Sequence, residues 1–229
     1  MRRVLLLALT LIAGQAWAAE LALPDYERVV LDNGTVLLLS QKDEVPLIGM
    51  QAVVRGGSAA DPADRAGLAA LLAAVMQKGA GERDAAAFAE ATAGVGGTIS
   101  VRADVESIDI AADFLSRDVE LMIELVADLL MRPQLSEEEF EKERGRGIGL
   151  IQAAKGANPS NLMSSYGNAF IFGEHPYGNP AFGSETSLAE ISHEDVLDFY
   201  ANNFGGDRLI IAVAGDFDLE AMKARLTSV

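Results

Sequence analysis

The chain contains no cysteine and only two histidines, His175 and His193, among its 229 residues. Without cysteine it can form neither a disulfide nor a thiolate metal site. Both histidines lie far along the chain from the alanine-rich stretch AGLAALLAAVMQKGA at 66–80, which itself holds no metal-binding side chain. A histidine-rich zinc site built by this chain alone is therefore not expected.

Basic residues are also scarce, at 18 against 34 acidic ones, which gives a net charge of −16. So acidic a chain is not expected to bind nucleic acid or an anionic membrane. The acidity would suit a cationic peptide as ligand, and solubility explains the charge equally well. Half of the residues are apolar, which is enough for one well-buried domain or at most two small ones.

The N-terminus reads MRRVLLLALTLIAGQAWAAE. Two arginines precede a short apolar run, and Ala16-Trp17-Ala18 forms an A-x-A cleavage site. This pattern predicts a secretory signal peptide over residues 1–18, cleaved after Ala18. The apolar run is too short to favour a membrane anchor. We therefore expect one domain at 19–229, periplasmic or secreted, with no membrane association after the signal is removed.

Hydrophobic periodicity predicts short strands joined by tight turns, together with longer helices. Asn33-Gly34 favours a hairpin between the first two strands, and Asp64, Ser136 and Ser192 are expected as helix N-caps. The predicted strands are 26–32, 35–41, 47–55, 98–104, 106–114 and 208–214, and the predicted helices are 65–77, 84–93, 116–131, 136–154, 161–172, 192–203 and the segment from 219. This pattern indicates an α+β fold, with a mostly antiparallel sheet of about five to six strands covered by helices.

Five segments form a family pattern through their order along the chain. They are LDNG at 31–34, RGGSAADPADRAGLA at 55–69, HPYG at 175–178, GSETSL at 183–188 with the helix ending FYANNF, and VAGDFD at 213–218. Together they resemble the N-terminal half-domain of the pitrilysin/insulinase-type metallopeptidases, which are related to the mitochondrial processing peptidase. The resemblance runs from about residue 25 to the end and implies the same fold. Subunits of that family usually hold two such domains, so a second one beyond residue 229 stays an open possibility.

The resemblance also implies where a zinc site would lie. In active members the helix reads G-L-A-H-x-x-E-H, in which two histidines bind zinc and the glutamate activates a water molecule. A glutamate on a later helix is the third ligand. The aligned positions in this chain are Ala70, Ala73, Ala74 and Leu150, whereas the neighbouring family acid is kept as Glu143. Aliphatic side chains have no lone pair for a metal, so we expect neither a metal site nor a catalytic residue here.

The first functional hypothesis is a non-catalytic partner of an HxxEH-bearing zinc peptidase subunit. The resemblance implies that zinc is held only by that catalytic partner, while this chain shapes the chamber and helps to bind extended peptides. A peptide would add to an exposed sheet edge by main-chain hydrogen bonds. The segment 97–104 matches the substrate strand of the family, and an ordinary core strand is the alternative. The candidate substrate-binding residues are Gly97, Thr98, Ile99, Ser100 and Val101.

Two further hypotheses stay open. One is a periplasmic peptide-binding or scaffold module without a proteolytic role, and the other is a hydrolase that uses a different site. Ser58, Ser164 and Ser165 lack the G-x-S-x-G setting of a nucleophile, and the acidic run 137–139 is explained by a solvated first helical turn. We expect the HPYG segment to be a structural turn and His193 to be solvated at a helix start.

Overall fold

The computed structural model describes residues 24–158, 160 and 163–228. The predicted signal peptide lies outside this part of the chain. A single six-stranded sheet organises the rest, in the order β1-β2-β8-β3-β7-β6. Neighbouring strands are antiparallel, except that β2 and β8 run parallel. The strands are β1 (Glu27–Val30), β2 (Val36–Gln41), β3 (Leu47–Arg55), β6 (Thr98–Ala103), β7 (Ser107–Leu115) and β8 (Leu209–Gly215). The predicted fold class is confirmed.

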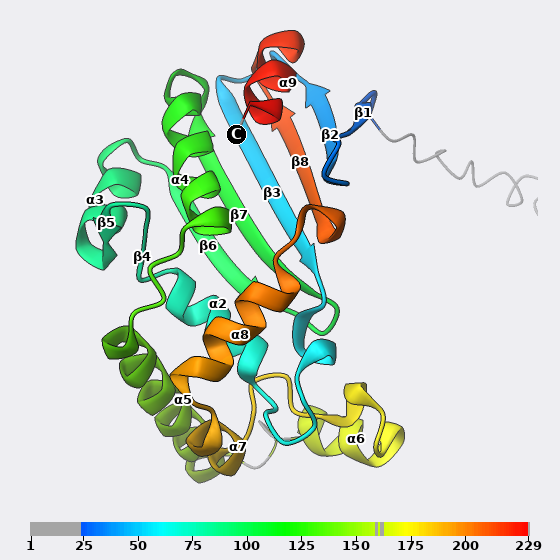
Figure 1. Cartoon of the computed structure of the whole chain (residues 1–229), viewed down its shortest axis with the longest axis vertical. Helices are drawn as coiled ribbons and strands as arrows, with labels where there is room; N and C mark the ends of the chain where they lie inside the picture. The colour runs from blue at the N-terminus through cyan, green and yellow to red at the C-terminus, as the bar shows by residue number, and fades with distance from the viewer. Residues whose placement is uncertain (1–23, 159, 161–162, 229) are drawn as a thin grey trace, which may run out of the picture.

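The helices gather on one face and at one end of the sheet (Figure 1). Helices α4 and α9 lie across the strands, whereas α2, α5, α7 and α8 form a second group beyond them, and α6 projects at the far end. Their bounds are α2 (Leu68–Met76), α3 (Ala85–Gly94), α4 (Val119–Met131), α5 (Glu137–Ala157), α6 (Met163–Phe172), α7 (Glu185–Glu190), α8 (His193–Asn203) and α9 (Leu219–Thr227). No helix in the described ranges is both long enough and apolar enough to cross a membrane.

The core lies between this sheet and the helices that cover it. Along β3, Ile48, Met50, Ala52 and Val54 are buried, and the residues between them are partly exposed. Strand β7 shows the same alternation. Because successive side chains of a strand point to opposite faces, the buried set faces the helices. The period of two read from the sequence is therefore correct for the central strands.

Short elements are the ones that the sequence pattern does not predict. The hairpin of β4 (Gly79–Ala80) and β5 (Arg83–Asp84) has two residues in each strand. Helix α7 has six residues and begins at a capping box between Ser184 and Ser187. None of these segments is long enough for an apolar period to appear.

The start of α2 corrects one expectation. Asp64 does not cap the helix, which begins three residues later than predicted, after Gly67 in a left-handed conformation at φ 95°. Asp61 instead accepts hydrogen bonds from the backbone N–H groups of Gly67 and Ala69, at 2.8 and 2.9 Å. A side chain six residues before the cap satisfies these free helical donors, whereas Asp64 pairs with Arg65 at the surface.

Candidate functional site

Helix α2 separates the core from a pocket. Leu68, Leu72 and Met76 are buried against the sheet and the other helices. Ala70 and Ala74, one helical turn apart, share the opposite face, because residues four apart lie above one another on a helix. A helix made of alanine, leucine and other apolar side chains can be buried on one side and still present a smooth hydrocarbon surface on the other.

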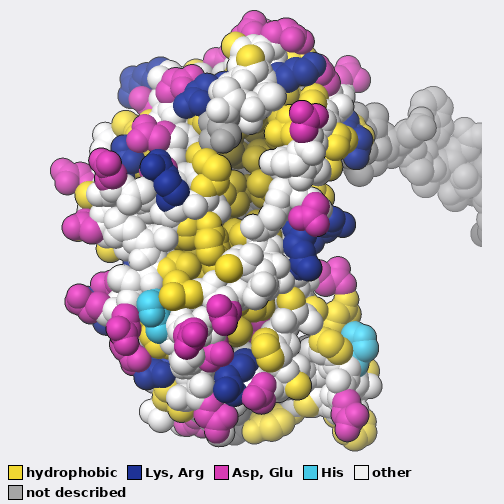
Figure 2. All heavy atoms as spheres, in the orientation of Figure 1, with side chains coloured by type: hydrophobic (Ala, Val, Ile, Leu, Met, Phe, Trp, Pro, Cys, Tyr) yellow, Lys and Arg dark blue, Asp and Glu magenta, His cyan; other side chains and the backbone are white. Residues whose placement is uncertain are grey.

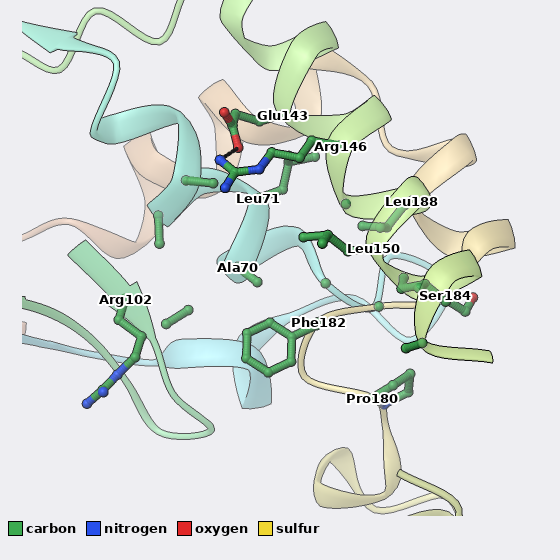
Figure 3. A pocket seen from close by; sticks show the side chains of 18 of the residues that line it. Ala70, Leu71, Arg102, Glu143, Arg146, Leu150, Pro180, Phe182, Ser184 and Leu188 are labelled. Carbon is green, nitrogen blue, oxygen red and sulfur yellow. Dashed lines mark hydrogen bonds and ion pairs between the residues drawn. The ribbon is translucent and has the colours of Figure 1, made fainter. Parts of the chain in front are cut away.

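The pocket has a volume of about 630 Å³. Its walls come from α2, from β6, from α5 and from the loop 180–184 (Figure 3). All four positions that the resemblance assigns to zinc chemistry line it, namely Ala70, Ala73, Ala74 and Leu150. The structure thus brings together residues that lie about 80 positions apart in the sequence, and every one of them offers only carbon and hydrogen atoms to the cavity.

The side chains of this pocket do not fit zinc. Glu143 is the single carboxylate among the described residues that line it. One of its oxygens lies 2.9 Å from the ammonium group of Lys78, and the other lies 3.5 Å from the guanidinium group of Arg146. Zinc needs several nitrogen, sulfur or carboxylate ligands in a tetrahedral arrangement. Within the described part of the chain, His, Cys, Asp and Glu nowhere form a group of three that could hold a metal ion.

Strand β6 forms the edge of the sheet next to this pocket, and its only strand neighbour in the sheet order is β7. Of the predicted substrate-binding residues, Val101 lines the pocket, whereas Thr98, Ile99 and Ser100 follow the edge away from it. Gly97 precedes the strand. Packing explains the glycine at this position, since an added Cβ would lie 2.6 Å from the ring of Phe114. Val101 is buried as well, so the strand serves both the core and the edge.

Gln77 makes a contact with the edge strand that the sequence did not reveal. Its amide nitrogen donates to the main-chain oxygen of Val101 at 3.0 Å and to that of Ala73 at 3.2 Å. In an antiparallel ladder every second residue turns its N–H and C=O away from its partner strand. The bond to Gln77 places Val101 among the outward-facing residues of β6, together with Ile99 and Ala103. No local pattern could have shown a contact that joins residues 24 positions apart.

The mouth of the pocket carries two aromatic residues that sequence reasoning also missed. Phe182 lies in a loop for which the sequence pattern predicted no regular structure, and Tyr166 lies on α6. Both side chains are largely exposed. Figure 3 shows the ring of Phe182 between Ala70 and Pro180, on the side of the pocket opposite Glu143. A bulky apolar residue in a polar loop was the available signal, because such residues are usually buried unless they serve a contact.

The HPYG segment is a turn, as predicted. His175 Nδ1 accepts a hydrogen bond from the backbone N–H of Tyr177 at 3.2 Å. An added Cβ on Gly178 would lie 2.4 Å from the main-chain oxygen of Gly173, so only glycine fits there. The Tyr177 hydroxyl donates to the carboxylate of Glu106. These contacts give the segment a structural role.

The expectation of a solvated His193 is wrong. Its Nε2 atom lies 2.6 Å from the main-chain oxygen of Leu135, and its ring packs on Phe140 with 5.6 Å between the centroids. Ser192 is the N-cap of α8, as predicted. His193 therefore fixes the start of α8 against the segment that leads into α5.

Of the three serines considered as alternative nucleophiles, only Ser58 has a side chain in the described part of the structure. Ser58 is buried in the short helical turn after β3, and the side chains of Ser164 and Ser165 lie outside the described set. Glu138 and Glu139 pair with Lys142 at 2.8 and 2.7 Å at the start of α5, and the side chain of Glu138 is largely exposed. This acidic run is the solvated first turn of a helix.

The chain belongs to the insulinase family, peptidase family M16, whose family model matches residues 36–185. An uncharacterised zinc protease of Mycobacterium leprae is 27% identical over 197 residues, which cover 86% of this chain and 44% of that protein. A non-peptidase homolog, YmxG, of Helicobacter pylori is 23% identical over 184 residues, which cover 80% of this chain and 42% of that protein.

Solved structures with the same fold include the following two. The peptidase M16 inactive domain of Pseudomonas fluorescens superimposes with a TM-score of 0.84 at 21% identity, over 89% of this chain and 50% of that one. A protease from Helicobacter pylori superimposes with a TM-score of 0.81 at 20% identity, over 90% and 49% of the two chains. The chain therefore spans about half the length of the relatives that it matches.

Proposed function

We propose that this chain is a peptidase-like subunit that does not cleave peptides itself and acts as the partner of an HxxEH zinc peptidase. One observation carries the proposal. Ala70, Ala73, Ala74 and Leu150 meet in a single pocket and offer it no lone pair. Metal-assisted hydrolysis needs a bound cation to lower the pKa of a water molecule. Among the described residues that line this pocket, the one carboxylate, Glu143, is already paired with Lys78 and Arg146.

The role in peptide binding is inferred from the pocket and the sheet edge together. Val101, Arg102 and Ala103 belong both to the pocket wall and to the edge strand β6. An extended peptide can join such an edge by main-chain hydrogen bonds, while pockets beside it select side chains. The proposed contribution of this chain is to hold a peptide next to the zinc site of its partner.

An apolar surface on α6 supports a contact with another protein. Met163, Phe170 and Ile171 are exposed, and the side chain of Phe170 is 91% exposed. Figure 2 shows hydrophobic side chains at the surface in the end of the molecule where α6 lies. Several large apolar side chains exposed on one short helix are typical of an interaction surface. We assign this face to the catalytic partner.

Relatives give further support for a non-catalytic role. One of them is named a non-peptidase homolog, and one solved domain is described as inactive. Other relatives are named zinc proteases, so the family contains both kinds of protein. The proposed location is the periplasm, which rests on the pattern of residues 1–18 alone.

The test is a reconstitution with an HxxEH-bearing family member encoded beside this chain. Peptide cleavage and bound zinc are measured for each protein alone and for the mixture. We expect cleavage by the mixture to exceed the sum of the separate activities by about tenfold or more. A tenfold change corresponds to about 1.4 kcal/mol of free energy. We expect zinc to be bound only by the partner. Stoichiometric zinc and cleavage by this chain alone would refute the proposal.

A periplasmic peptide-binding module is the second candidate function. The pocket beside the edge strand β6 favours it, because both features can act without a partner. The same reconstitution separates the two functions. Peptide binding by this chain, without any effect on the activity of the HxxEH protein, would favour the binding module.

A further inference from the structure

The charges around the pocket differ in sign from those of the rest of the molecule. Acidic residues outnumber basic ones by 34 to 18 in the chain, and Figure 2 shows acidic side chains over much of the visible face. Among the described residues that line the pocket, however, Arg102, Arg146 and Lys155 are cationic and only Glu143 is anionic. The remaining lining is mostly hydrocarbon.

Two of these cations have capacity for another carboxylate. Arg146 and Lys78 both pair with the single carboxylate of Glu143, so these three side chains together carry one excess positive charge. Arg102 lies 3.7 Å from Asp104, and both side chains are more than 60% exposed. Exposed pairs of that length contribute little to stability and are readily exchanged. Lys155 differs, because it already forms a close ion pair with Glu185.

Arg102 borders the pocket, but its side chain leaves β6 on the face opposite the buried side chains and points away from the cavity (Figure 3). Val101 and Ala103 are buried toward the helices, whereas Arg102 between them is exposed on the other face. Side chains of an added strand alternate between the same two faces. A peptide that places one side chain in the pocket would therefore turn the residue before it and the residue after it toward the face of Arg102.

We propose that the pocket accepts one aliphatic or aromatic side chain of an extended peptide, and that an acidic residue directly beside it in the peptide pairs with Arg102. Ala70, Ala74, Leu150 and Phe182 supply the apolar contact, and the excess positive charge at Arg146 favours acidic peptides in general. This assignment rests on the proposed function for its choice of a peptide as ligand. It also reverses the expectation, drawn from net charge, of a cationic peptide.

The test is fluorescence anisotropy with the purified chain and three labelled peptides of equal length, acetylated and amidated so that their ends carry no charge. Their centres read Glu-Leu-Glu, Lys-Leu-Lys and Glu-Ser-Glu. We expect the first to bind about tenfold more tightly than either of the others, because it alone supplies both the apolar group and the carboxylates. Higher salt should narrow the difference between the first two, since exposed charges are screened.

Two variants separate the two parts of the site. Arg102→Glu should abolish or reverse the preference for glutamate over lysine, whereas Leu150→Gln should weaken only the preference for leucine over serine. Both side chains are largely exposed, so thermal unfolding should stay close to wild type. The matched control is Arg117→Glu, whose exposed arginine lies outside the pocket lining and should change neither preference.

Two results would overturn the assignment. One is equal or tighter binding of the lysine peptide, and the other is binding of dodecanoate with none of the three peptides, which would make the pocket a fatty-acid site. Failure of the proposed function looks different. Selective binding of the Glu-Leu-Glu peptide without activation of an HxxEH partner would leave this site intact and remove only the partner role.

Discussion

Gln77 holds the main-chain oxygen of Val101 at 3.0 Å, on the side of β6 where an added strand would bind. The same amide nitrogen bonds Ala73, so the contact joins α2 to the edge of the sheet. A peptide strand would offer its own N–H to that oxygen and would have to displace the glutamine. Gln77 thus competes with any peptide for one hydrogen-bond acceptor of the edge.

The first prediction is that Gln77→Ala tightens peptide binding about two- to tenfold, since one net hydrogen bond is worth about 0.5–1.5 kcal/mol. Isothermal titration with the Glu-Leu-Glu peptide measures the change. Gln134→Ala is the control, because that amide also donates to a main-chain oxygen, that of Gly81, and lies outside the pocket lining. Unchanged or weaker binding by Gln77→Ala would show that the glutamine does not compete.

The second prediction concerns the convergence of the four hydrocarbon positions. The triple variant Ala70→His/Ala74→His/Leu150→Glu should bind one zinc ion with an affinity at least about tenfold above that of the double variant Ala70→His/Ala74→His, because a third ligand completes the protein share of a tetrahedral site. All three positions are partly or largely exposed, so the new side chains have room. Competition with a zinc-sensitive dye, after a check of circular dichroism, provides the measurement.

The double variant is the matched control in that experiment, and wild type is the second. A folded triple variant that binds zinc no better than the double variant would mean that Leu150 does not face the histidine positions. The alignment that assigns these residues to the zinc positions of the family would then fail, although the pocket itself would remain.

The sequence predicted the sheet well because its strands are long enough for the period of two to show. Strand β3 matches the expected range 47–55 at both ends. Helix α2 began later than predicted, because the residue that satisfies its first N–H groups is Asp61, outside the usual capping position. Local propensity cannot report a side chain that reaches forward over six residues.

The pocket could be predicted only in part. The family resemblance located four of its residues on two helices, yet other parts of the wall come from Phe182 and from residues 101–103 of the sheet edge. Their juxtaposition depends on how α5 and the loop 180–184 pack against α2. The spacing of residues along the chain does not predict this packing. The excess of basic over acidic residues at the pocket follows from the same packing, so it could not be read from the net charge of the chain.

The third prediction addresses the apolar face of α6. Phe170→Glu should weaken the complex with an HxxEH partner by about tenfold or more, since a charge would replace an aromatic anchor in the interface. Analytical ultracentrifugation or biolayer interferometry measures the affinity. Thermal unfolding of the isolated chain should change little, because Phe170 is 91% exposed.

The control for that variant is Val45→Glu, which places a charge on another exposed apolar residue, in the segment between β2 and β3. It should leave the affinity for the partner unchanged. An intact complex with Phe170→Glu would place the partner contact elsewhere and would leave the exposed face of α6 unexplained.

The fourth prediction follows from the burial of Asp61 beneath the start of α2. Desolvation raises the pKa of its carboxyl to about 6, although the N–H groups of Ala69 and Gly67 act in the opposite direction. In the unfolded chain the pKa of an aspartate is about 4. Folding therefore strengthens proton binding at Asp61. The contribution of the carboxyl to the free energy of unfolding is greatest below pH 4 and is lost as the pH rises through about 6.

Urea unfolding of wild type and of Asp61→Asn between pH 4 and pH 7 checks this. The asparagine cannot ionise, so the stability of wild type relative to the variant should fall with rising pH, by about 1–3 kcal/mol over that range. Asp64→Asn is the control, because Asp64 is exposed and forms only a surface pair with Arg65. A pH-independent difference between wild type and Asp61→Asn would mean that the backbone donors of α2 offset the desolvation and keep the carboxylate ionised throughout.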